Sequence, residues 1–258
     1  MKTAAIIPAR GGSVRLRRKN VRQFCGLPLV EWSIIQALCS HRIDRVFLCT
    51  DDKEIAAIGE KHGAEIIMQP DWGAGSSATR ATSWSIAAIE ERGFEAERIV
   101  CLLPTSPLRY PEDIDKGIAK HEQTGFHLSA MARRRETFLF RDIHGMVARQ
   151  HTFDKSGSYL QDNSGLYTVY DASWLKWCYP LWDSAVDELG MSIDEMVETN
   201  VYCPKSNTHY EECALWQCTE TDTLEEFELA EVLMDLYILK ARGLGTYLNY
   251  RDEGENDE

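Results

Sequence analysis

Thr3-Ala-Ala-Ile-Ile-Pro-Ala9 leads directly into Arg10-Gly-Gly-Ser-Val-Arg-Leu-Arg-Arg-Lys-Asn20, so a short apolar run passes into a basic loop that contains two glycines. The apolar run predicts a buried β-strand that ends at Pro8. A glycine pair lets backbone N–H groups approach an anion, and neighbouring cations add charge-assisted hydrogen bonds. The start of the chain therefore indicates an α/β fold whose first loop binds a small anionic ligand.

Strand-like and helix-like segments alternate through the first half of the chain. Further apolar runs predict strands at 45–49, 64–67 and 98–103. Helical spacing and capping residues predict helices at 29–38, 53–62, 78–92 and 111–121. Such alternation is typical of βαβ units with a mainly parallel sheet. Because ligands of open α/β sheets bind outside the carboxyl ends of the strands, the first loop, Thr50-Asp51 and Thr105-Ser106 are expected on one rim.

The second half of the chain is less regular. Segments 126–131 and 165–170 keep strand character, and 225–242 predicts a last amphipathic helix. The residues of that helix expected to face a core are Phe227, Ala230, Leu233, Met234 and Tyr237. We therefore predict a single domain over residues 1–245, with an elaboration at about 133–182 and an acidic tail at 246–258.

Composition and charge exclude several classes of partner. The 258 residues carry a formal net charge of −13, which disfavours general nucleic-acid binding because that requires a positive surface. No stretch approaches the roughly 20 apolar residues that span a bilayer, and the apolar start is too short for a signal peptide, so we expect a cytoplasmic protein with no membrane partner. The eight cysteines form no CxxC pair, which favours structural thiols over a metal site.

Five segments resemble, in the same order, motifs of the acylneuraminate cytidylyltransferase (CMP-sialic acid synthetase) family. They are Ile7–Asn20, Val46–Asp52, Leu103–Arg109, Asn163–Tyr167 and Glu220–Glu231. The resemblance implies a three-layer α/β/α fold of the nucleotide-diphospho-sugar-transferase type, in which about 133–182 forms a dimerisation and sugar-site extension. It also implies transfer of CMP from CTP to a sialic-type 2-keto-3-deoxy sugar acid (a nonulosonic acid), with release of pyrophosphate, by a protein that is often a homodimer.

The resemblance also implies roles for individual residues. Those implied for nucleotide binding are Ala9, Arg10, Gly11, Gly12, Ser13, Arg15, Lys19, Asn20 and Ser77. Those implied for sugar binding are Thr105, Ser106, Arg109, Arg149, Gln150, Asn163 and Tyr167. Catalysis is assigned to Arg10, Lys19 and Asp222, and Mg²⁺ to Glu220 and Asp222, because Mg²⁺ prefers oxygen ligands and alternate residues of an extended segment face one side. Without the resemblance, a helix cap also explains Asp222.

Five positions depart from the family pattern. Val14 replaces a loop lysine, Arg17 a proline, Ser77 an aspartate, Leu103 a glutamine and Glu220 an aspartate. Three alternatives stay open for this reason: a different sugar acid such as Kdo, a rearranged grip on the triphosphate, or a homologue that binds nucleotide or sugar acid without turnover.

Overall fold

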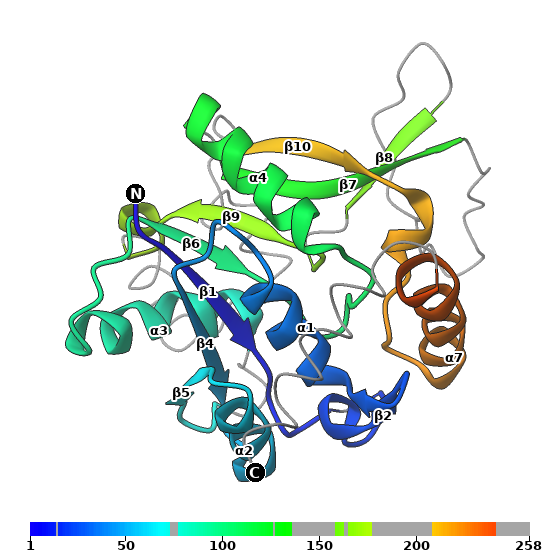
Figure 1. Ribbon diagram of the computed structural model, residues 1–258, viewed down its shortest axis with the longest axis horizontal. Helices are drawn as coiled ribbons and strands as arrows, with labels where there is room; N and C mark the ends of the chain where they lie inside the picture. The colour runs from blue at the N-terminus through cyan, green and yellow to red at the C-terminus, as the bar shows by residue number, and fades with distance from the viewer. Residues whose placement is uncertain are drawn as a thin grey trace, which may run out of the picture.

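The computed structural model describes residues 1–13, 15–72, 77–125, 127–135, 158–162, 165–176 and 208–240. Its centre is a sheet with the strand order β10-β7-β9-β6-β1-β4-β5, in which β8 also pairs with β7 (Figure 1). The strands are β1 (Thr3–Pro8), β4 (Arg45–Thr50), β5 (Glu65–Met68), β6 (Arg98–Cys101), β7 (His127–Arg135), β8 (Ser158–Asp162), β9 (Thr168–Asp171) and β10 (Thr208–Cys213). β1 is parallel to both β4 and β6, whereas β9 runs antiparallel to β6 and β7. The mainly parallel sheet predicted from the sequence is confirmed.

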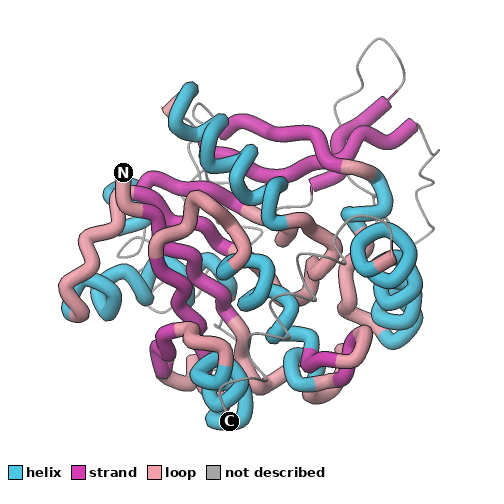
Figure 2. The backbone as a smooth tube through the Cα atoms, in the orientation of Figure 1, coloured by secondary structure: helices cyan, strands magenta, loops and turns pink. Residues whose placement is uncertain are grey.

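Helices cover both faces of this sheet (Figures 1 and 2). Helix α3 (Ala78–Glu91) covers one face, and α1 (Leu29–Leu38), α2 (Lys53–Lys61) and α4 (Pro111–Thr124) cover the other. Successive side chains of a strand point to opposite faces. Accordingly, Ala5 and Ile7 of β1 belong to the core under α1, α2 and α4, whereas Ala4 and Ile6 belong to the core under α3. The expected three-layer α/β/α arrangement is confirmed.

Helix α2 begins where its capping residue predicts. Asp52 accepts hydrogen bonds from the backbone N–H groups of Glu54 (2.8 Å) and Ile55 (3.2 Å), two of the donors that a helix start leaves without an intrahelical partner. This cap also fixes the Asp52 carboxylate beside the first loop, where it contributes to the site described below.

The last described helix packs against the beginning of the chain. The elements involved are η1 (Lys19–Val21), β2 (Gln23–Phe24), β3 (Leu27–Pro28), η5 (Leu215–Cys218), α7 (Leu224–Leu233) and the π-helix η6 (Met234–Leu239). The rings of Phe24 and Phe227 meet edge to face at 5.2 Å within a third apolar core. The prediction that Tyr237 faces this core is wrong, because the wider turn of η6 brings Ile238 inward and leaves Tyr237 39% exposed.

The sequence did not predict β10. Its sequence, Thr208-His-Tyr-Glu-Glu-Cys213, lacks an apolar alternation, yet it extends the sheet by pairing in parallel with β7. Of the expected elaboration at 133–182, the structure describes the end of β7, β8 and residues 165–176. None of the described helices has the length and apolar character required to cross a membrane.

Candidate active site

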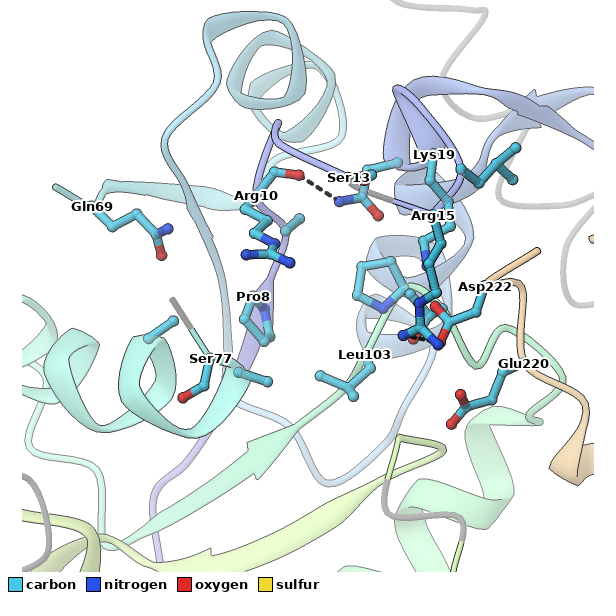
Figure 3. Close-up of a pocket in the computed structure, with 17 residues that line it drawn as sticks. Pro8, Arg10, Ser13, Arg15, Lys19, Gln69, Ser77, Leu103, Glu220 and Asp222 are labelled. Atoms are coloured by element: carbon cyan, nitrogen blue, oxygen red, sulfur yellow. Dashed lines mark hydrogen bonds and ion pairs between the residues drawn. The ribbon is translucent and has the colours of Figure 1, made fainter. Parts of the chain in front are cut away.

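A pocket of about 370 Å³ opens at the carboxyl ends of β1, β5 and β6, on the rim that the strand order predicts (Figure 3). The first loop lines it with Pro8, Ala9, Arg10, Ser13, Arg15, Leu16, Lys19 and Asn20. The remaining lining residues are Gln69, Ser77, Ala78, Ala81, Leu103, Pro104, Thr105, Glu220 and Asp222. Residues from both ends of the chain therefore share one cavity.

Close backbone packing shapes the first loop. The Gly11 N–H donates a hydrogen bond to Asp51 Oδ1 at 2.7 Å. A Cβ atom at Gly11 would lie 2.5 Å from Asp52 Oδ2, so this position requires glycine. At Gly12 the same atom would meet nothing within 4 Å among the described residues. Gly11 and Gly12 were both expected at the nucleotide; neither lines the pocket, and Gly11 fixes the path of the loop.

The cations in the pocket differ in what they contact. Arg10 projects into the cavity, and among the described residues its guanidinium makes neither a hydrogen bond nor an ion pair (Figure 3). Lys19 and Arg15 form ion pairs with the two oxygens of Asp222. The Lys19 side chain is 8% exposed and that of Arg15 is 70% exposed. Within the described part of the chain, the pocket thus holds one cation without a partner and two that share a carboxylate.

Two neutral polar residues complete this part of the wall. Asn20 donates from Nδ2 to the Arg10 carbonyl at 2.9 Å, and its buried Oδ1 accepts no hydrogen bond from the described residues. Ser77 caps α3, because its Oγ accepts from the Arg80 N–H at 3.1 Å. Ser77 occupies a position where the resemblance leads one to expect an aspartate, so a helix cap replaces a negative charge here.

Glu220 and Asp222 reach the pocket from one extended segment. Thr221 between them is fully buried, and its N–H and hydroxyl both donate to the Thr105 carbonyl, at 3.0 and 3.2 Å. This anchor turns the two carboxylates to the same side (Figure 3). Burial, and next the negative charge of Asp222, raise the pKa of the Glu220 carboxyl above its usual value. The charge of Asp222 therefore makes ionisation of Glu220 less favourable, even though Lys19 and Arg15 pair with Asp222.

The segment after β6 contributes Leu103, Pro104 and Thr105 to the pocket but not Ser106 or Arg109. Arg109 is fully buried, and its guanidinium donates hydrogen bonds to the carbonyls of Leu103 and Ser106. The Ser106 hydroxyl is buried against Gly165, where a Cβ atom would lie 2.3 Å from Ser106 Oγ. In this structure Arg109 and Ser106 are buried beneath the loop and stabilise it. Of the three expected sugar contacts in this segment, only Thr105 faces the cavity.

Tyr167 also lies beneath the surface. It is 3% exposed, a Cβ atom at Gly117 would lie 2.6 Å from its ring, and burial raises the pKa of its hydroxyl. It does not line the pocket. The other expected sugar contacts, Arg149, Gln150 and Asn163, lie outside the described residues, as does Val14 of the first loop.

Seven lining residues were not among the predicted site residues. Four of them lie within the motifs (Pro8, Leu16, Leu103 and Pro104), and three lie outside them (Gln69, Ala78 and Ala81). Gln69 directly follows β5, so the rule that placed Thr105 on the rim could have found it. Ala78 and Ala81 lie one turn apart at the start of α3, and their small side chains carry no chemical signal. Leu103, the residue found in place of the family's glutamine, does line the cavity.

Residues 4–238 match the family model described as Cytidylyltransferase. The chain belongs to that family. As a member it is a nucleotidyltransferase enzyme, and the pocket described above is its candidate active site.

Similar proteins agree with this assignment. The cytidylyltransferase is 28% identical over 240 residues to pseudaminic acid cytidylyltransferase of Campylobacter jejuni, an alignment that covers 90% of this chain and 96% of the relative. It is 33% identical over 132 residues to CMP-N,N'-diacetyllegionaminic acid synthase of Legionella pneumophila, covering 48% and 55% of the two chains. Among solved structures, CMP:2-keto-3-deoxy-manno-octonic acid synthetase complexed with CTP has a TM-score of 0.65 at 17% identity, covering 91% of this chain and 99% of the other. The last likeness confirms the expected fold.

Proposed function

We propose that this enzyme transfers CMP from CTP to a nonulosonic, sialic-type 2-keto-3-deoxy sugar acid. In this reaction a hydroxyl oxygen of the sugar acid forms a bond to the α-phosphorus of CTP and loses its proton. The bond between the α-phosphorus and the oxygen bridging to the β-phosphorus breaks, and pyrophosphate leaves. The main catalytic requirement is to stabilise the negative charge that accumulates on the leaving group.

The observation that carries the proposal is the arrangement of charges around one cavity. Arg10, Arg15 and Lys19 lie on one wall, and Glu220 and Asp222 approach from the opposite end of the chain (Figure 3). The cations suit phosphate oxygens, and the guanidinium of Arg10, which has no partner among the described residues, is available without breaking a contact within that part of the chain. A neutral ligand would offer these cations no charged partner.

The donor set also fits Mg²⁺. Glu220 and Asp222 offer carboxylate oxygens, and the pKa of Glu220 is raised first by burial and next by the negative charge of Asp222, both of which a bound cation would counter. No group of three or more metal-ligating side chains occurs among the described residues, which suits Mg²⁺ because it takes one or two carboxylates together with substrate phosphates and waters. When bound, Mg²⁺ would neutralise charge on the phosphates. Glu220 and Asp222 are the residues that would hold it.

Relatives support the choice of sugar acid. The pseudaminic acid cytidylyltransferase aligns over nearly its whole length, whereas a 3-deoxy-manno-octulosonate cytidylyltransferase of Pelodictyon phaeoclathratiforme aligns at 36% identity over 44% of its length. The longer alignment covers 90% of the chain and so reaches its second half, where four of the seven expected sugar contacts lie. It favours a nonulosonic acid over Kdo.

We also propose a homodimer, built by the elaboration at about 133–182. The aromatic and irregular composition of this region suits an interface core. Multi-angle light scattering at micromolar concentration should give a mass near twice the 29.4 kDa of one chain. A monomer would contradict this part of the proposal.

Pyrophosphate release provides the direct test. Purified protein is incubated with CTP, Mg²⁺ and a panel comprising pseudaminic, legionaminic and N-acetylneuraminic acids and Kdo. We expect release with at least one nonulosonic acid and less with Kdo. Asp222→Asn should abolish the signal, whereas Glu228→Gln, a matched loss of charge at an exposed position of α7, should not. Retained CTP binding with no release for any sugar acid would contradict the proposed reaction.

A further inference from the structure

Gln69 forms part of the pocket wall on the side opposite Glu220 and Asp222. It directly follows β5, and its backbone N–H extends the ladder with β4 by donating to the Thr50 carbonyl at 2.9 Å. The residue is 7% exposed, and its amide points into the cavity on the side where Arg10 lies (Figure 3). The direction of this amide therefore decides which hydrogen bond the wall offers to a ligand.

A thiol fixes that direction. Cys49 Sγ lies 3.2 Å from Gln69 Oε1 and 3.9 Å from the Ala81 carbonyl, so the amide oxygen is the nearer acceptor. Cys49 is fully buried, and burial raises the pKa of its thiol to about 12, so the S–H hydrogen is retained at neutral pH. A protonated thiol has one hydrogen to donate. The Gln69 oxygen accepts it, and the NH₂ group is left facing the pocket.

This wall then presents the NH₂ group of Gln69 and the guanidinium of Arg10 as donors. Among the described residues, Gln69 Nε2 has no hydrogen-bond partner, and the nearby Arg10 guanidinium has no acceptor atoms at all. Ser77 Oγ already accepts from a backbone N–H, so its hydroxyl hydrogen is also available to donate. Ala78 and Ala81 beside them are small enough to leave space for a flat ring. A ligand group bound here must offer acceptors.

Cytosine suits this wall better than uracil, although both bases carry carbonyl acceptors, because the two bases differ at N3. Cytosine carries two adjacent acceptors, N3 and O2, whereas N3 of uracil carries a hydrogen and would meet the NH₂ group donor to donor. We propose that Cys49 is a positioning residue that orients the Gln69 amide, and that Gln69 thereby selects cytosine over uracil. The proposal rests on the proposed function, because it takes CTP as the nucleotide.

The test is the ratio of CTP to UTP affinity, measured by isothermal titration calorimetry with Mg²⁺. Cys49→Ala removes the donor that holds the amide oxygen, so the amide can turn, and the CTP preference should fall about three- to tenfold. Cys49→Ser keeps a donor and should recover part of the preference. Gln69→Glu, an isosteric change that removes the NH₂ group, should lower the preference at least as far as Cys49→Ala.

Two controls separate positioning from general damage. Cys101→Ala removes another buried thiol, on β6, which is separated from β4 by β1; this thiol accepts a hydrogen bond from Thr82 Oγ1, and its loss should leave the CTP to UTP ratio unchanged. Binding of inorganic tripolyphosphate should stay the same in Cys49→Ala, since the cations that hold phosphates are untouched. Thermal unfolding of the two alanine variants shows whether they lose stability equally.

The outcomes are distinguishable. A CTP to UTP ratio that Gln69→Glu leaves unchanged would overturn the inference, even if Cys49→Ala fails to fold. A ratio that falls equally in Cys49→Ala and Cys101→Ala would overturn the positioning role of the thiol. If the unmodified protein neither binds CTP nor releases pyrophosphate, both this inference and the proposed function fail. If it turns over CTP and no variant alters the ratio, only this inference fails.

Discussion

Lys19 and Asp222 form an ion pair across 203 positions of the chain, and Arg15 occupies the other oxygen of the same carboxylate. Asp222 thus holds two of the cations that a triphosphate would require. For a nucleotide to engage both cations, these ion pairs must open, which is favourable when a divalent cation replaces them at the carboxylate.

We therefore expect opposite effects of Asp222→Asn on binding and on turnover. Turnover should fall by about a hundredfold or more, because a carboxylate proposed to hold Mg²⁺ is lost. In a chelator, however, CTP should bind the variant roughly tenfold more tightly, because Lys19 and Arg15 are released for the phosphates. Calorimetry with EDTA and steady-state kinetics with Mg²⁺ measure the two effects. Weaker CTP binding in EDTA would show that the ion pairs do not compete with the nucleotide.

We expect that replacing Arg10 lowers activity but leaves the stability of the fold nearly unchanged. Its guanidinium has no partner among the described residues, so Arg10→Ala should change the free energy of unfolding by less than about 0.5 kcal/mol. The kcat/KM for CTP should fall roughly ten- to hundredfold, as expected for a lost charge-assisted contact. Arg109→Ala provides the contrast: it removes a buried guanidinium that holds two carbonyls and should lower stability by at least about 2 kcal/mol. A destabilised Arg10→Ala would contradict this division of roles.

The two adjacent glycines of the first loop should respond differently to alanine. Gly11→Ala places a methyl group against Asp52, which caps α2, and should lower the free energy of unfolding by about 1–3 kcal/mol. Gly12→Ala meets no described atom and should leave stability nearly unchanged. Urea unfolding of both variants tests the pair. Equal losses would mean that backbone freedom, and not the contact with Asp52, requires glycine at these positions.

The raised pKa of Glu220 predicts how metal-free stability varies with pH. Below the pKa of the unfolded chain, Glu220 is protonated in both states and has no effect. As pH rises from that value to the higher pKa of the folded state, the unfolded state releases its proton first, so stability falls. Glu220→Gln should remove this fall. The stability of the variant relative to the unmodified protein should therefore increase as pH rises from acidic to neutral. Urea unfolding in EDTA measures the free energies of unfolding of the variant and the unmodified protein. Parallel pH profiles of the two would contradict a raised pKa of Glu220 in the folded state.

Much of the fold followed from the sequence because the strands of a parallel sheet are continuous apolar runs. The apolar run predicted the end of β1 at Pro8, and the predicted start of the second helix at Lys53 is also correct, with Asp52 as its cap. β10 escaped prediction because its residues are largely polar, and its place in the sheet depends on β7, far away in the sequence. Tyr237 was misplaced because a π-helix changes the helical register without a signal in the residue pattern.

The candidate site was predicted less evenly. Motif residues that are close in sequence, such as Thr105, Ser106 and Arg109, separate in space into one that faces the cavity and two that support it from below. A motif gives residue types and spacing but not the direction of each side chain. Gln69 was missed for the converse reason: it belongs to no motif and reaches the pocket only through the packing of β5 beside β4.

The packing of α7 against the N-terminal hairpin has a consequence for synthesis on the ribosome. Phe24 and Trp32 emerge early, but the residues that cover them, Phe227 and Met234, are among the last to be translated. Until then the nascent chain exposes an apolar surface, and Arg15 and Lys19 lack the carboxylate of Asp222; long-range contacts of this kind form slowly. The nascent chain is therefore a natural client for chaperones that shield apolar surface. A chain truncated before residue 222 has the basic first loop but lacks the carboxylate that pairs with Arg15 and Lys19.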